Sequence, residues 1–263
     1  MANSSSESTG HLHLGSDEDE HHKTAIWELL MSTQMTMRLT WQKRLKRILF
    51  SILIKRLFLE GGKSRVTRLS AEFVFRIHAK YPSTELFHSR EKLWNTFGKH
   101  LSQEQWIGFE FGVASGDATK TFLKMPYAEK CLGWHGFDTF MGLPSEWGDL
   151  PKGAFSTDGV PPQIKSDLLN WHIGRIENTC TIINSLNNLD KNFIVIFDFD
   201  LYTATKAAWE VIVNYLKSGD IIYFDEAYEA DENQIIDEII KSQQVNLQVI
   251  GYTTMGIAFQ IKG

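Results

Sequence analysis

The sequence predicts an α/β fold in which a mostly parallel sheet, with one antiparallel strand, is flanked by helices. Short apolar runs alternate with helical segments from Trp106 to the C-terminus. Phe193–Phe197 is almost purely apolar, which is typical of a strand buried on both faces. Two apolar runs joined by Thr253–Gly256 close the chain, and this late hairpin supplies the antiparallel strand. The 263 residues suffice for one large α/β domain with an N-terminal helical extension.

These patterns give the elements in chain order. We expect strands at Trp106–Phe111, Cys131–Phe137, a segment just before Gly174, Phe193–Phe197, Asp220–Phe224, Leu247–Tyr252 and Ile257–Ile261. One helix begins near Asp117, and another covers Thr203–Leu216. Because strands joined through a helix run parallel, most strands end at the same edge of the sheet. In open α/β sheets that edge is where ligands bind.

The N-terminal hundred residues differ from the rest. Residues 1–22 have almost no large apolar side chains and are expected to be a disordered tail. Residues 23–100 carry apolar residues at helical spacing, so we expect helices that form a lid, a contact in a homo-oligomer or packing helices. Segment 43–56 is basic and amphipathic, which fits packing on the parent domain or contact with an anionic membrane surface. Residues 101–263 then form the ligand-binding domain.

Composition excludes several classes of protein. The formal net charge of −5 does not indicate a nucleic-acid partner. Cys131 and Cys180 form no C-x-x-C pair, so neither a disulfide framework nor a zinc site is expected. The N-terminus lacks the basic and apolar regions of a signal peptide, and the longest apolar run is too short to span a bilayer. We therefore expect a cytoplasmic protein without a transmembrane segment.

The stretch Glu110–Gly116 has the form E-x-G-x-A-x-G between a strand and a helix. Gly112 permits a sharp turn, while Ala114, Ser115 and Gly116 let a ligand approach the main chain. Amides at the helix start can then bind an anionic group. The spacing differs from the G-x-G-x-x-G of dinucleotide sites and favours S-adenosylmethionine, whose cationic methionine moiety Glu110 would contact. A merely tight strand–helix connection is the alternative.

Carboxylates follow three of the predicted strands. Asp138, beside Thr139, is positioned for ribose hydroxyls because a carboxylate accepts two hydrogen bonds. Asp198, Asp225 and Glu226 end the two neighbouring apolar strands, and their repulsion would favour a hard cation such as Mg²⁺. Asp198 is also a candidate general base. The alternative is that these acids cap the following helices, the favoured interpretation for Asp200.

Three segments resemble motifs of the macrocin O-methyltransferase-like family of class I methyltransferases. They are Gly136–Pro144 (GFDTFMGLP), Asp198–Lys206 (DFDLYTATK) and Gly219–Glu226 (GDIIYFDE). The resemblance implies a Rossmann-like, seven-stranded fold, S-adenosylmethionine as methyl donor, and Mg²⁺ held by Asp198, Asp225 and Glu226. The chain departs from the pattern at Glu226, where the family has aspartate, and at Ala227, where it has tyrosine.

The leading hypothesis is an S-adenosylmethionine-dependent O-methyltransferase acting on a hydroxyl of a small molecule such as a sugar, glycoside or phenol. A non-catalytic S-adenosylmethionine-binding module, a metal-dependent hydrolase and a nicotinamide-dependent oxidoreductase are the alternatives. The long connection from Pro144 to Asn170 is expected to form a lid or substrate wall. Other polar and aromatic candidates near the site are expected to be packing or surface residues in many cases: Trp147, Lys152, Phe155, Trp171, Arg175 and His135.

Overall fold

The computed structural model describes residues 65–102, 105–186 and 189–263. Residues from Arg68 to Gly263 form one compact unit. The predictions of a disordered tail at 1–22 and of the basic amphipathic segment 43–56 lie outside the described residues, as does most of the predicted helical region 23–100. Among the described helices, none is long and apolar enough to cross a membrane.

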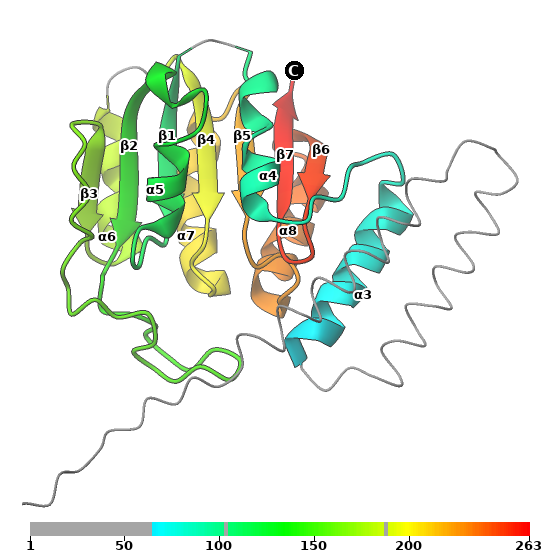
Figure 1. Ribbon diagram of the computed structural model, residues 1–263, viewed down its shortest axis with the longest axis horizontal. Helices are drawn as coiled ribbons and strands as arrows, with labels where there is room; N and C mark the ends of the chain where they lie inside the picture. Colours follow the sequence, from blue (N-terminus) through cyan, green and yellow to red (C-terminus); the bar gives the residue numbers. More distant parts are fainter. Residues whose placement is uncertain (1–64, 103–104, 187–188) are drawn as a thin grey trace, which may run out of the picture. The chain divides into compact units, whose positions relative to one another are not determined.

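The described residues contain a seven-stranded sheet with the strand order β3-β2-β1-β4-β5-β7-β6 (Figure 1). The strands are β1 (Trp106–Phe111), β2 (Cys131–Asp138), β3 (Leu169–Ile173), β4 (Asn192–Phe197), β5 (Ile221–Phe224), β6 (Asn246–Tyr252) and β7 (Ile257–Lys262). Pairing is parallel from β3 through β5, while β7 is antiparallel to both β5 and β6. This is the Rossmann-like fold of class I methyltransferases, so the predicted fold, with its one antiparallel strand, is confirmed.

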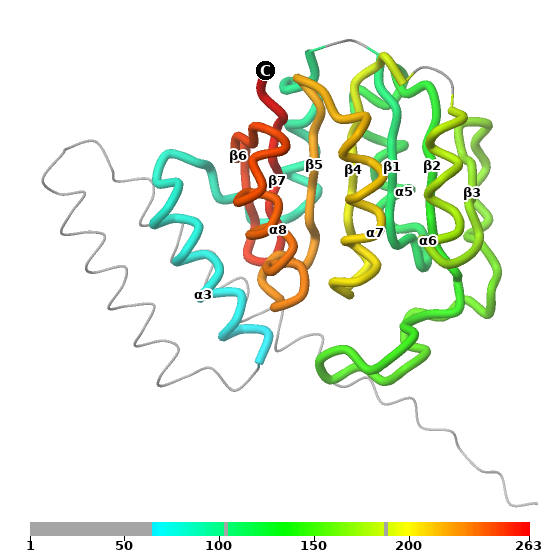
Figure 2. The backbone as a smooth tube through the Cα atoms, turned by 180° about the vertical axis from the view of Figure 1, so that it is seen from behind, coloured from blue at the N-terminus to red at the C-terminus, as the bar shows by residue number. Residues whose placement is uncertain are grey.

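Helices cover both faces of the sheet. The described helices are α3 (Arg65–Lys80), α4 (Arg90–Trp94), α5 (Asp117–Phe122), α6 (Ile176–Thr179), α7 (Tyr202–Ile212) and α8 (Ala230–Ser242), with short 3₁₀ turns at Phe97–Lys99, Ala128–Lys130, Cys180–Ser185 and Val213–Tyr215. Figure 1 shows α4 and α5 on one face, and Figure 2 shows α6, α7 and α8 on the other. The predicted helix 203–216 ends at Ile212 and continues only as a 3₁₀ turn.

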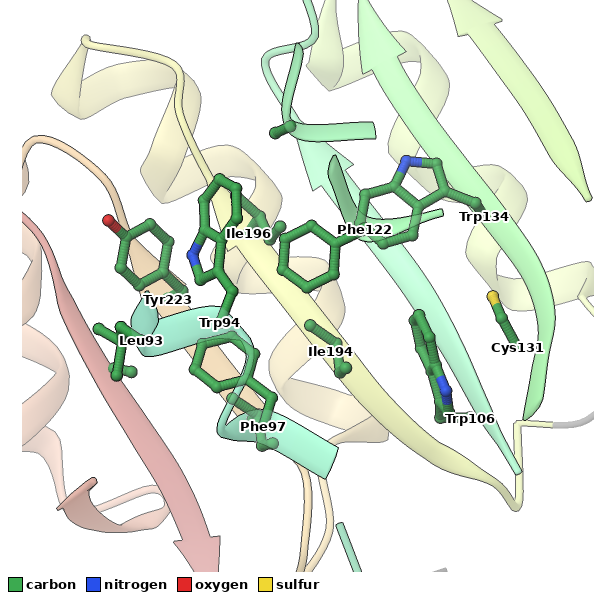
Figure 3. Packing of buried hydrophobic residues seen from close by; sticks show 13 residues of the cluster. Leu93, Trp94, Phe97, Trp106, Phe122, Cys131, Trp134, Ile194, Ile196 and Tyr223 are labelled. Carbon is green, nitrogen blue, oxygen red and sulfur yellow. The ribbon is translucent and has the colours of Figure 1, made fainter. Parts of the chain in front are cut away.

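Aromatic side chains fill the layer between the sheet and the α4–α5 face (Figure 3). The Trp94 ring lies 4.7 Å from Phe122 and 5.5 Å from Tyr223, measured between ring centroids. Phe122 in turn lies 5.0 Å from Trp134. Buried aromatic residues of this size dominate the energetics of a core. Helix α4, which precedes the predicted domain boundary at residue 101, thus contributes to the core of the sheet.

The buried carboxylate of Asp220 joins β4 and β5 at the end of the sheet where these two strands begin. Asp220 is fully buried, and its Oδ1 accepts hydrogen bonds of 2.9 Å from the Phe193 amide and from the Asn192 side chain. Its Oδ2 accepts one of 2.8 Å from the Lys217 amide. Because these bonds tie the starts of two parallel strands together, they also set the level at which the two strands end.

Candidate functional site

The carboxyl ends of β1, β4 and β5 lie level with one another. Phe111 pairs with Phe197, and Phe197 pairs with Phe224. The amide of Asp198 therefore donates to the Phe111 carbonyl at 2.8 Å, and that of Asp225 to the Phe197 carbonyl at 3.1 Å. A cavity of about 400 Å³ opens at this edge, where the chain order reverses on either side of β1. This is the position at which open α/β sheets bind ligands.

The glycine-containing loop after β1 forms one wall of the cavity. Gly112 has a φ of 94°, and a side chain there would overlap the carbonyl oxygen of Asp198. Gly116 has a φ of 74°, and its added Cβ would lie 2.8 Å from Pro162 and 3.0 Å from Ile164. Both glycines are therefore required by the backbone itself. We predicted that a ligand would approach the main chain closely at Gly116. In the structure this close approach is made by residues of the 139–168 connection, which joins β2 to β3.

Asp138 organises this loop, a role that the sequence did not reveal. Its Oδ2 accepts hydrogen bonds of 2.8 Å from the amides of Val113 and Ala114, and its Oδ1 accepts one of 2.7 Å from Phe140. A carboxylate offers about four acceptor positions, so about one is left for a ligand. The predicted contact with two ribose hydroxyls is thus limited to about one further hydrogen bond. Ala114 is held at a φ of 45°, in the left-handed region.

Local bonds also engage the other loop residues that we predicted to bind the cofactor. The Thr139 hydroxyl accepts a hydrogen bond of 3.1 Å from the amide of Met141. Ser115 donates at 2.8 Å to Asp117, which also pairs with Lys120 at 2.9 Å. Asp117 is the first residue of α5, and its charge complements the positive end of the helix. An anionic ligand group predicted at this helix start would have to share the position with Asp117.

Glu110 lines the cavity, but its carboxylate is hydrogen-bonded to neighbouring side chains of the protein. The residue is 1% exposed, and its Oε2 accepts a hydrogen bond of 2.8 Å from the Trp134 indole and one from the Thr119 hydroxyl. Burial raises the pKa of Glu110 to about 7, although both donors favour the ionised form. Its predicted contact with a cationic ligand group stays a prediction, while its contact with α5 is a structural finding.

Three carboxylates converge beside the loop. Oxygens of Asp198, Asp200 and Glu226 lie within 4.8 Å of one another. Burial, followed by the charge of Asp225, raises the pKa of Asp200 to about 7, and burial raises the pKa of Asp198 and of Glu226 well above the usual range. Glu226 Oε2 is buried and has no hydrogen-bond partner among the described residues. An oxygen-only donor set with an unpartnered oxygen fits a hard divalent cation.

Asp225, which we predicted as a metal ligand, is engaged otherwise. Its Oδ2 lies 2.5 Å from Nη1 of Arg90, and its Oδ1 accepts a hydrogen bond of 2.7 Å from the Tyr223 hydroxyl. Burial alone would lower the pKa of Arg90, but the charges of Asp225 and Asp198 outweigh it and raise the value. Sequence reasoning missed Arg90. No motif marks this arginine as part of the site, and it lies 135 positions before Asp225 in the sequence.

The alternative that these acids cap the following helices is contradicted by the helix starts. Helix α7 begins at Tyr202 after Leu201, and the Tyr202 amide donates a hydrogen bond of 3.2 Å to Asp231 rather than to one of these acids. Helix α8 begins at Ala230 with Glu229 as its N-terminal flanking residue. Asp200, for which we favoured the capping role, instead has a φ of 64° and joins the carboxylate cluster.

The connection between β2 and β3 forms the remaining wall. Leu143, Pro144, Trp147 and Phe155 line the cavity, and Phe155 is 53% exposed. Trp171 does not line the cavity, and its ring lies beside Gly136 and 6.3 Å from the Phe140 ring. Lys152 is exposed.

Two further candidates behave as expected from their sequence positions. Arg175 lines the cavity and pairs with Glu177 at 3.1 Å, with most of its side chain exposed. His135 is a packed histidine: it stacks on Phe109, and its Nδ1 lies 3.0 Å from Nε2 of His172. Burial lowers the pKa of His135 to about 4.

Comparisons with known proteins give likenesses in structure. Neither a family model nor a curated protein matches the chain. The calicheamicin methyltransferase CalS11 is similar with a TM-score of 0.48 and 19% identity, over 98% of this chain and 99% of that chain. The O-methyltransferase NovP gives 0.44 and 13%, over 65% and 76%. MycE, a mycinamycin-pathway methyltransferase solved with Mg and SAH, gives 0.43 and 10%, over 76% and 54%. The fold assignment stands on the strand order, and the resemblance to macrocin O-methyltransferases stays a prediction.

Proposed function

We propose that this protein is an S-adenosylmethionine-dependent O-methyltransferase that acts on a hydroxyl of a small molecule with the help of a divalent cation. The observation that carries the proposal is the juxtaposition of the glycine-containing loop and the carboxylate cluster on one cavity. The two features touch directly, because Gly112 packs on the carbonyl of Asp198. A methyl donor on the loop would thus lie beside a hydroxyl held at the acids.

Each part of the cavity has a role in this proposal. S-adenosylmethionine would supply the methyl group, and Mg²⁺ in the cluster would stabilise negative charge on the acceptor oxygen. Asp198, Asp200 and Glu226 would hold the cation. The acceptor oxygen would gain the methyl group as the methyl–sulfur bond of S-adenosylmethionine breaks and S-adenosylhomocysteine leaves, and the hydroxyl proton would pass to a carboxylate oxygen of Asp198.

The outer wall supports an acceptor with an apolar or aromatic part. Trp147 and Phe155 line the cavity together with Leu143 and Pro144. Aromatic side chains stack on flat or apolar surfaces such as a phenol or a sugar ring. Burial of this kind would also keep water away from the transferred group.

A metal-dependent hydrolase is the second candidate, and one observation favours it. Asp138, which would bind a ribose in a methyltransferase but has no such role in a hydrolase, uses its carboxylate to accept three backbone hydrogen bonds. Binding of S-adenosylhomocysteine distinguishes the two candidates, because a hydrolase has no use for it. Calorimetric titration with S-adenosylhomocysteine and with NAD, each with and without Mg²⁺, should give binding of the first ligand alone.

The catalytic part is tested through Asp198. We expect Asp198→Asn to reduce turnover by about 10²–10⁴-fold, the range for loss of a positioned base. Affinity for S-adenosylhomocysteine should stay nearly unchanged, since the loop that would bind it is intact. Turnover is measured as release of S-adenosylhomocysteine after a screen of sugars, glycosides and catechols. A variant as active as the wild type would rule out this role for Asp198.

A further inference from the structure

Arg90 reaches the carboxylate cluster from a different part of the fold. It is the first residue of α4, and its guanidinium lies 5.1 Å from the centre of the Trp94 ring. Its Nη1 lies 2.5 Å from Asp225, a residue 135 positions away in the sequence. Stacking on an aromatic ring orients the planar guanidinium, so little freedom is lost when it pairs with a carboxylate.

The ion pair withholds Asp225 from the cluster. Both oxygens of Asp225 are engaged, one by Arg90 and the other by the Tyr223 hydroxyl. The group of mutually close carboxylates accordingly consists of Asp198, Asp200 and Glu226. Of the described residues that line the cavity, the cationic ones are Arg90 and Arg175. Arg175 pairs with Glu177, so Arg90 is the cation that balances the cluster.

Helix α4 does not depend on this ion pair for its position. Leu93 and Trp94 are buried in the core, with 0% and 1% of their surface exposed. The Ser89 side chain caps the start of the helix by accepting a hydrogen bond of 3.3 Å from the Lys92 amide. Because α4 is held in the core by other contacts, Arg90 is available to interact with groups in the cavity. Its side chain is 35% exposed.

We propose that Arg90 is a tethered cation that competes with the divalent metal for Asp225 and thereby sets the metal affinity of the site. The inference rests on the metal site of the proposed function. With Arg90 in place, the metal is held by Asp198, Asp200 and Glu226 against the repulsion of a nearby positive charge. When the guanidinium leaves Asp225, a fourth carboxylate becomes available and the repulsion falls.

A double-mutant cycle on the full chain tests this competition. Mg²⁺ is titrated calorimetrically into the wild type, Arg90→Gln, Asp225→Asn and the double variant. We expect Arg90→Gln to bind Mg²⁺ at least about tenfold more tightly, because a repulsive charge is removed and Asp225 is released. Asp225→Asn should change affinity less than about threefold in the wild type but weaken it at least about tenfold in the Arg90→Gln background.

Arg175→Gln is the matched control, because it removes an arginine of the same cavity that pairs elsewhere. Its Mg²⁺ affinity should equal that of the wild type. If Arg90→Gln fails to fold, Arg90→Lys keeps the charge but loses the planar fork, and an affinity above that of the wild type supports the competition. Melting temperatures establish that each variant is folded.

Equal Mg²⁺ affinity in the wild type, Arg90→Gln and Arg90→Lys would overturn the inference. A full loss caused by Asp225→Asn in the wild type would do the same, since Asp225 would then ligate with Arg90 present. Absence of Mg²⁺ binding in every variant would remove both the inference and the metal part of the proposed function. Titration with S-adenosylhomocysteine shows in that case whether the methyl-donor site survives. Binding by Arg90→Gln alone would support the competition most strongly.

Discussion

At this site a single side chain can both hold the local backbone and face the cavity, and Asp138 is the clearest example. Its carboxylate accepts hydrogen bonds from the amides of Val113, Ala114 and Phe140. The loop that would face a ligand is thus shaped by an acid that the sequence suggested would bind the ligand itself. A residue of this kind affects stability and binding together.

Asp138→Ala should therefore destabilise the protein as well as weaken ligand binding. Leaving the partly buried amides without an acceptor should lower the free energy of unfolding by about 2–4 kcal/mol. Urea denaturation measures this change, and calorimetry with S-adenosylhomocysteine should show weaker binding. Asp149→Ala, at an exposed position of the 139–168 connection, is the control. Unchanged stability with lost binding would mean that Asp138 serves the ligand alone.

Glu110 gives a prediction of pH dependence. Burial raises its pKa from 4.5 to about 7, so the folded protein keeps a proton that the unfolded chain has already lost in that window. The stability of the wild type should therefore fall with rising pH relative to Glu110→Gln, by up to about 3 kcal/mol between pH 4.5 and 7. Above pH 7 the difference should be constant. Urea denaturation at several pH values checks the slope, and parallel stability profiles of the two proteins would contradict it.

At the scale of elements, the site depends on the level at which neighbouring strands end. Asp198 and Asp225 follow β4 and β5 directly, and their amides continue the ladder of the sheet. The level is set partly at the other edge, where Asp220 joins the starts of the same strands. Catalytic candidates and a structural carboxylate are thus linked through two short strands.

Asp220→Ala should lower the free energy of unfolding by about 3 kcal/mol or more, since it removes the acceptor of the buried donors of Asn192 and Phe193 and of the partly buried Lys217 amide. Thermal and urea denaturation measure the loss. Asp190→Ala removes an exposed acid near the start of β4 and should change stability by less than about 0.5 kcal/mol. Similar stability of the two variants would show that Asp220 does not fasten the strands.

Element prediction succeeded where the pattern is long and failed where it is short. Strand β1 was predicted at its observed bounds, because a buried parallel strand is mostly apolar and Glu110 is the one charged residue in it. Helix α6 was not predicted, because four residues are too few for a helical period to be visible. Helix α4 lies within region 23–100, where we expected helices, but its bounds were not predicted and its residue Arg90 was not singled out for the site.

For the whole molecule, ligands should stabilise the folded state by mass action. S-adenosylhomocysteine at about 100 times its dissociation constant should raise the free energy of unfolding by about 2.7 kcal/mol. For a unit of this size that corresponds to an increase in melting temperature of about 5–10 °C. Mg²⁺ should add to the increase, EDTA should reverse that part, and NAD should have no effect. Equal shifts with NAD and S-adenosylhomocysteine would contradict the proposed ligand class.

The sequence by itself determined the succession of strands along the chain, the presence of one antiparallel strand in the late hairpin and the edge of the sheet where the acids gather. These features follow from local patterns of apolar residues and from short connections between elements. Each such pattern can be recognised within its own segment of the sequence. Only the tertiary structure decided how the acids are used. Asp200 joins the cluster through a left-handed backbone, Asp138 holds a loop, and Asp225 pairs with Arg90. Such roles depend on side-chain directions and on contacts between distant segments, which no local pattern encodes.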